Sequence, residues 1–258
     1  MDWLKSLCIA LSTYSAVPVP QFRWTDENMA CSFCFLPAVG LIIALAEYLW
    51  LLLCWRTGFN LILRTAVATA LPLLLTGGIH MDGFCDTADA LAAHQDAARS
   101  LEIMKDSRTG AFAVIFCAVY LLLQFGLVSE ASGSRGVFCA VFVLSRAVSV
   151  LSVTGFKNAR GSGMLAAFQA PARRKTVRRA AWAWIALCAL FMDLCDVFAG
   201  TGALLGCIAA WHGYHATAMK RFGGITGDTS GFFIQILELS MLAGMVLGAA
   251  AEILTGAF

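Results

Sequence analysis

The sequence predicts an all-α protein, a polytopic integral membrane bundle of about seven transmembrane helices within a range of six to eight. Of its 258 residues, 60% are hydrophobic and 13% are charged, and the mean hydropathy is +0.78. Soluble domains have about half of their residues apolar and about a quarter charged. The composition therefore excludes an ordinary soluble enzyme, and we expect residues 1–258 to form a single membrane-embedded domain.

Seven apolar windows account for the predicted spans. A helix of about 20 residues rises about 30 Å, which is the thickness of the hydrocarbon core of a bilayer. The windows are residues 35–55, 61–79, 111–129, 136–155, 181–199, 200–218 and 232–254. Residues 1–17 have the composition of a signal peptide, but we expect a retained helix that is ended by Pro18 and Pro20.

Ten cysteines are present, and most of them stand singly inside the apolar windows. A buried free cysteine behaves as a small apolar residue, so no disulfide framework is expected. Cys31 and Cys34 have C-x-x-C spacing, but neither a second pair nor a histidine cluster follows at the distance of a zinc site. Packing at a helix start is the preferred interpretation of this pair.

The basic residues are distributed unevenly along the chain. Residues 80–110, 156–180 and 219–231 fall on one side of the predicted bundle, together with the amino-terminal region. These segments hold Lys105, Arg108, Lys157, Arg160, Arg173, Arg174, Lys175, Arg178, Arg179, Lys220 and Arg221, whereas Arg56, Arg64 and Arg135 lie in the opposite segments. By the positive-inside rule the first side is cytoplasmic, which predicts an inner-membrane protein with its active site on the cytoplasmic side. A net charge of +2 gives no reason to expect a nucleic-acid partner.

An acidic stripe follows the second apolar window, in "GGIHMDGFCDTADAL" at residues 77–91. Asp82, Asp86 and Asp89 are spaced i, i+4 and i+7, which places them on one face of a helix. Three carboxylates on one face repel one another, so a divalent cation between them is expected, and Mg²⁺ is the cation that suits carboxylate and phosphate oxygens. The alternative is a set of solvated aspartates at the membrane interface.

Groups of cations and glycines lie in the same polar segments, where they could hold phosphate. The candidates for substrate binding are Lys105 with Arg108, Lys157 with Arg160, and Lys220 with Arg221, followed by Gly223, Gly224 and Gly227. The candidates for proton transfer are Asp106, Asp228 and His80. Each group taken singly is equally consistent with an ordinary loop.

Six blocks read in order resemble the cobalamin synthase family of adenosylcobinamide-GDP ribazoletransferases. They are "YSAVPVP" at 14–20, "FLPAVG" at 35–40, "GGIHMDGFCDTADAL" at 77–91, "IMKDSRTGAFA" at 103–113, "GSGM" at 161–164 and "GGITGDTSG" at 223–231. The resemblance implies a Mg²⁺-dependent membrane enzyme that joins adenosylcobinamide-GDP to α-ribazole, or to its 5′-phosphate, and releases GMP. It leaves room for a homo-oligomer and for contacts with other enzymes of the corrinoid pathway.

In this hypothesis the three aspartates hold Mg²⁺ against the substrate diphosphate, with help from Lys105 and Arg108, and Asp228 or Asp106 takes the proton of the attacking hydroxyl. A CDP-alcohol phosphatidyltransferase would use similar chemistry, but its D-x-x-D-G-x-x-A-R pattern is absent. A transporter is the other alternative, because Glu47, Arg146 and Glu238 lie within apolar windows.

Overall fold

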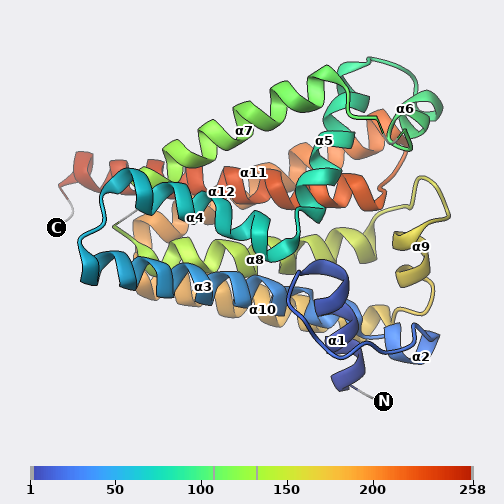
Figure 1. The fold of residues 1–258 in the computed structure, drawn as a ribbon, viewed down its shortest axis with the longest axis horizontal. Coiled ribbons are helices and arrows are strands. Elements are labelled where there is room, and N and C mark those ends of the chain that lie inside the picture. Colours follow the sequence, from blue (N-terminus) through green and yellow to red (C-terminus); the bar gives the residue numbers. More distant parts are fainter. Residues whose placement is uncertain (1–2, 107, 132, 257–258) are drawn as a thin grey trace.

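The computed structural model describes residues 3–106, 108–131 and 133–256. Within these ranges the chain is helical, apart from one isolated parallel bridge between Asn158 and Ile225. The long helices run side by side along the long axis of the molecule, and the short helices gather at one end of the bundle (Figure 1). The predicted all-α membrane class is confirmed.

Each of the seven apolar windows coincides with one long helix. These are α3 (Leu36–Thr57), α4 (Leu61–Thr76), α7 (Ala111–Glu130), α8 (Arg135–Gly155), α10 (Arg174–Cys195), α11 (Val197–Thr217) and α12 (Gly227–Thr255). The shorter elements are α1 (Trp3–Tyr14), α2 (Asp26–Met29), the 3₁₀ turn η1 (Ser32–Phe35), α5 (Ile79–Ala92), α6 (Ala97–Ile103), α9 (Met164–Gln169) and the π turn η2 (Ala218–Phe222).

Four helices of the described chain are long and apolar enough to cross a membrane: α3, α7, α8 and α12. The number rises to five if α4 and α5, which are bent by 93° at their junction, form one broken span. α4 has only 16 residues, and α10 begins with the basic run "RRKTVRR" at 173–179. The prediction of seven spans therefore stays a prediction.

Helix α8 is the centre of the bundle. In its apolar window 89% of the residues are buried, against 22% in α7, which lies at the edge. α8 packs against α3, α10 and α12. The approach of α3 is close because a Cβ at Gly40 would lie 2.2 Å from the carbonyl oxygen of Phe142. A glycine at this position is what lets the two backbones touch.

The structure also bears on the predictions for the amino-terminal helix and for the cysteines. α1 is a helix that ends at Tyr14, and the stretch containing Pro18 and Pro20 is not helical. All ten cysteines are free. Cys31 and Cys34 are buried in the main hydrophobic core at η1, where packing is the expected role of this pair.

The charges inside the bundle have specific positions. Arg146 of α8 forms an ion pair with Glu238 of α12, both fully buried, and Ser145 donates a hydrogen bond to the same carboxylate. Glu47 of α3 is fully buried, and neither of its carboxyl oxygens has a hydrogen-bond partner among the described residues. An internal partner is what a charge in the membrane requires, and the Arg146–Glu238 pair meets that requirement.

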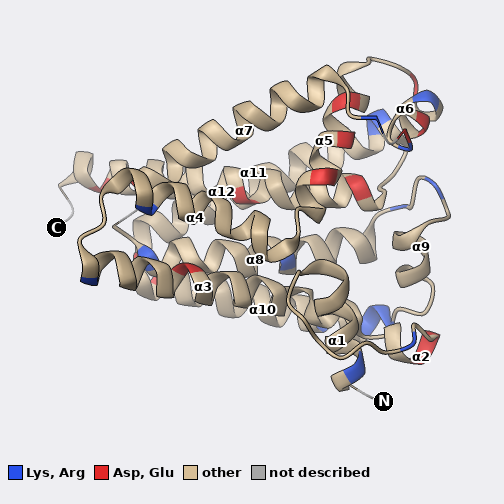
Figure 2. Cartoon of the chain, viewed as in Figure 1, with Lys and Arg blue, Asp and Glu red and all other residues tan. Residues whose placement is uncertain are grey.

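The predicted polar segments meet at one end of the molecule. Figure 2 shows most charged residues there, around α5, α6, α9 and the start of α12, and few at the opposite end. The contacts are specific: the Arg160 guanidinium donates to the Leu101 carbonyl at 3.4 Å, and that of Arg221 donates to the Leu91 carbonyl at 3.3 Å. The prediction that these segments share one face is confirmed.

Candidate functional site

Helix α5 lies across the end of the bundle because the chain turns sharply before it. Gly77 and Gly78 have φ values of +62° and +76°, a left-handed conformation that glycine adopts without steric cost. They separate α4 from α5, whose axes differ by 93°. The acidic stripe is therefore carried outside the four long spans, on a helix that packs against the start of α12.

The contact between α5 and α12 is close enough to require glycine. A Cβ at Gly83 would lie 2.6 Å from the carbonyl oxygen of Asp228, and one at Gly231 would lie 3.1 Å from that of His80. The two backbones thus fix the carboxylates of α5 relative to Asp228. Gly83 is the glycine that follows the first aspartate of the stripe.

Replacing Gly83 with alanine is expected to force α5 away from α12, because the obstacle is backbone and not a movable side chain. Overpacking of this kind costs about 1–3 kcal/mol. We expect a lower Tm for Gly83→Ala in detergent. Gly126→Ala in α7 is the matched control, since nothing lies within 4 Å of its added methyl group. Equal Tm values for the two variants would contradict the close contact.

The three aspartates lie on one helix as predicted, but they differ in what they contact. Asp82 is exposed, whereas Asp86 and Asp89 are partly buried. The Asp89 carboxylate accepts hydrogen bonds from the backbone amides of Gly110 at 2.6 Å and Ala113 at 2.8 Å. Asp89 therefore caps the amino terminus of α7, where free amides and the helix dipole favour a negative charge.

Negative charge is concentrated around Asp86. Burial, together with the neighbouring carboxylates of Asp82, Asp228 and Asp89, raises the pKa of its carboxyl to about 6, against an opposing effect of Arg160. Within the described ranges, no three His, Cys, Asp or Glu side chains already form a metal-ligating group. Asp82 and Asp86 still fit Mg²⁺, which takes one or two protein carboxylates and fills its other positions with water and substrate phosphate.

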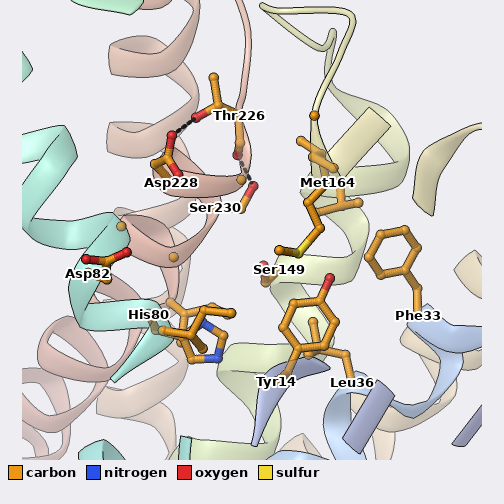
Figure 3. A pocket seen from close by; sticks show the side chains of 18 of the residues that line it. Tyr14, Phe33, Leu36, His80, Asp82, Ser149, Met164, Thr226, Asp228 and Ser230 are labelled. Atoms are coloured by element: carbon orange, nitrogen blue, oxygen red, sulfur yellow. Dashed lines mark hydrogen bonds between the residues drawn. The ribbon is translucent and has the colours of Figure 1, made fainter. Parts of the chain in front are cut away.

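A cavity of about 210 Å³ lies at Asp82, the first carboxylate of the acidic stripe. Figure 3 shows Asp82 on α5 and Asp228 at the start of α12 on one wall, with Tyr14, Ser149 and Met164 across from them. His80 lies below Asp82, and its ring stacks on that of Tyr14 with centroids 6.3 Å apart. The cavity thus has an acidic mouth and a mostly apolar interior.

Asp228 is held in place at the mouth. It lies in the first turn of α12, which begins with a capping box between Thr226 and Thr229. Its carboxylate accepts a hydrogen bond from the Arg160 guanidinium at 2.9 Å, and both side chains are partly buried. The ion pair joins the loop before α9 to the loop before α12.

The loop that carries Arg160 is fixed by the glycine-rich segment. The Ile225 amide donates to the Lys157 carbonyl at 2.8 Å, and the Ala159 amide donates to the Ile225 carbonyl at 2.9 Å. A Cβ at Gly224 would lie 2.4 Å from that Lys157 carbonyl oxygen, so this position accommodates glycine alone. Gly223 is in the left-handed conformation with φ of +69°.

A second cavity, of about 280 Å³, lies further along the stripe, at Asp86 and Asp89. It is polar, and it is lined by Asp86 and Asp89 of α5, by Arg99 and Glu102 of α6, and by Ile103, Asp106, Arg108 and Gly110. Arg108 forms an ion pair with Asp106 at 2.7 Å, and its hydrogen bonds lower the pKa of Asp106 to about 2. Asp106 is therefore a weak proton acceptor.

Comparison with known proteins gives the family. The family model described as cobalamin-5-phosphate synthase matches residues 6–246. The chain belongs to this family. Three similar relatives are each named adenosylcobinamide-GDP ribazoletransferase. The protein of Lachnoclostridium phytofermentans is 37% identical over 98% of this chain and 97% of its own length. The protein of Pseudomonas fluorescens Pf0-1 is 32% identical over 93% of this chain and 98% of its own length. The protein of Desulfitobacterium hafniense is 33% identical over 95% of this chain and 97% of its own length. No solved structure matches the chain.

The structure brings together part of the residue set that the sequence suggested for a cobalamin-5-phosphate synthase. Asp82, Arg160, Gly227 and Asp228 line the first cavity, and Asp86, Asp89, Asp106 and Arg108 line the second. The exposed side chains of Lys105, Lys157 and Lys220 are not among the lining residues of either cavity, and Arg221 ties η2 to α5. Burial, together with the positive charge of Arg146, lowers the pKa of His80 to about 3, so this histidine is a neutral part of the wall.

Sequence reasoning missed several lining residues in this member of the family. Tyr14 and Met164 stand in the blocks "YSAVPVP" and "GSGM", which carried the resemblance without a residue role. Ser149 lies in the middle of an apolar window, where nothing in the sequence marks it. Asn158 lines neither cavity, but its side-chain oxygen accepts from the amides of Arg160 and Gly161, a structural role that the sequence did not indicate.

Proposed function

We propose that this protein is an adenosylcobinamide-GDP ribazoletransferase that depends on Mg²⁺ and acts at the cytoplasmic side of the cell membrane. One observation supports the site: the acidic stripe of α5 lines two cavities, with Asp82 in the lining of the first and Asp86 in the lining of the second. In-line phosphoryl transfer places the attacking oxygen and the leaving oxygen on opposite sides of phosphorus. Two cavities lined by one carboxylate stripe would let the attacking group and the leaving group reach the same carboxylates from different positions.

The residues around the two cavities would have different roles in the reaction. Asp82 and Asp86 would hold Mg²⁺, which when bound would neutralise the charge that develops on the departing GMP. Arg99 and Arg108 line the polar cavity, where their guanidinium groups can bind the diphosphate. Asp89 keeps α7 in register with α5, so that the polar cavity stays formed.

The transfer forms one bond and breaks one bond. A ribose hydroxyl of α-ribazole, or of its 5′-phosphate, attacks the phosphorus nearer the corrinoid, and the bridging P–O bond to GMP breaks. Asp228 accepts the hydroxyl proton, since it lies at the mouth of the first cavity and Arg160 orients its carboxylate. Asp228 replaces Asp106 as the preferred base, because Arg108 keeps Asp106 ionised and weakly basic.

Membership of the family argues against the two alternatives, a CDP-alcohol phosphatidyltransferase and a transporter. The bilayer would hold the apolar helices, while the end of the bundle that carries most of the basic residues faces the cytoplasm. The large corrinoid would then approach the site along the membrane surface.

The test is a reaction with purified protein in detergent. We expect GMP release from adenosylcobinamide-GDP to require both α-ribazole and Mg²⁺, with the corrinoid product appearing in equal amount. Omitting α-ribazole separates transfer from hydrolysis, and EDTA followed by added Mg²⁺ tests the metal. Absence of GMP from folded protein under all these conditions would contradict the proposed function.

A further inference from the structure

We propose that the first cavity binds the base of the acceptor nucleoside, a bicyclic aromatic heterocycle with apolar edges, and that the attached sugar faces Asp82 and Asp228. The inference rests on the proposed function and states which of the two substrates occupies this cavity. The diphosphate of the other substrate is then left to the polar cavity at Asp86 and Asp89.

The walls of the cavity suit a flat aromatic ring. Tyr14 and His80 stack with an interplanar angle of 21°, and Leu36, Val153 and Ile234 supply aliphatic surface. Small-molecule sites are typically apolar with a few placed polar groups. Here the hydroxyls of Ser149, Ser162 and Ser230 are among the uncharged polar groups of the lining.

Size and polarity select between the ring systems of the two substrates. A cavity of about 210 Å³ cannot take a corrin macrocycle, but it accommodates a bicyclic base. Guanine is also bicyclic, yet it carries several donors and acceptors on its edges, and leaving these unpaired in an apolar interior is costly. The interior therefore favours a methylated benzimidazole over guanine.

The mouth of the cavity places the sugar next to the reacting groups. Asp228 and Arg160 lie on one rim, Asp82 lies on α5, and Met164 covers the opposite rim. A base held inside thus presents its ribose hydroxyls to the carboxylates. The same arrangement brings the attacking oxygen to the stripe at Asp82, while the diphosphate would lie at Asp86.

The test fills the cavity and measures each substrate separately. Ser149→Leu places a branched side chain from α8 into the space, and we expect it to raise both the Kd and the KM for α-ribazole by at least about tenfold. The KM for adenosylcobinamide-GDP and the Kd for GMP are expected to stay at the wild-type values. Ser129→Leu, the same substitution on α7 outside the cavity, is the matched control.

Met164→Trp provides a second variant in case the first one does not fold, because Met164 is 49% exposed on a short helix at the rim. We expect the same selective rise for α-ribazole. Equilibrium dialysis with labelled α-ribazole reads binding without turnover. Loss of α-ribazole binding in the cavity variants therefore supports the assignment even if no GMP is released by the wild type. Unchanged α-ribazole binding in a folded cavity variant, or weakened binding of GMP alone, would overturn it.

Discussion

Asp82→Asn is expected to lower Mg²⁺-dependent GMP release by at least about a hundredfold, which is the usual scale for losing a charge-stabilising group at a reacting phosphate. The change keeps the shape of the side chain but removes its negative charge. Asp82 is exposed, so the fold should survive the substitution and the Tm should stay close to that of the wild type. The measurement is the initial rate of GMP release as a function of Mg²⁺ concentration.

The control for this experiment is Asp193→Asn. Asp193 is an exposed aspartate near the far end of α10, so its replacement makes the same change of charge away from both cavities. Asp86→Asn should raise the Mg²⁺ concentration needed for half-maximal rate, because Asp86 is the second carboxylate available to the metal. Full activity of Asp82→Asn at low Mg²⁺ would remove Asp82 from the metal site.

The acidic stripe could be predicted because it depends only on the spacing of residues that are close together in the sequence. Helical periodicity alone places Asp82, Asp86 and Asp89 on one face, and the structure has them on α5. The partner of Asp89 could not be predicted in the same way, since its carboxylate caps a helix that starts 21 residues later in the chain. Arg160 and Asp228 are 68 positions apart, and their pairing depends on how two loops fold together.

The number of spans shows a related limit. Apolar windows located all seven long helices, because hydropathy follows directly from composition. Hydropathy does not register that the chain bends by 93° between α4 and α5, at Gly77 and Gly78. Backbone conformation at two glycines therefore decides whether the acidic helix lies within the bundle or across its end.

The Arg146–Glu238 pair gives the largest effect expected on stability. Both side chains are fully buried between α8 and α12, and Arg146 also donates to the Phe142 carbonyl at 3.1 Å. Removing one partner leaves a buried group without its counter-charge, at a cost of about 3–5 kcal/mol. We expect Arg146→Met and Glu238→Leu each to lower the Tm in detergent strongly.

The double variant tests whether stability depends on the pairing of Arg146 with Glu238 or on each charge separately. Replacing both members of a buried ion pair with apolar residues of similar volume is often neutral or stabilising. The variant with both Arg146→Met and Glu238→Leu should therefore have a Tm above that of either single variant. Arg135→Met, at the exposed start of α8, controls for loss of an arginine from this helix.

A double variant that unfolds at a temperature as low as the worse single variant would contradict a mainly pairwise role. In that outcome the two groups would each have separate partners in the buried polar core, where Glu47, Gln124 and Thr69 carry oxygens that have no hydrogen-bond partner among the described residues.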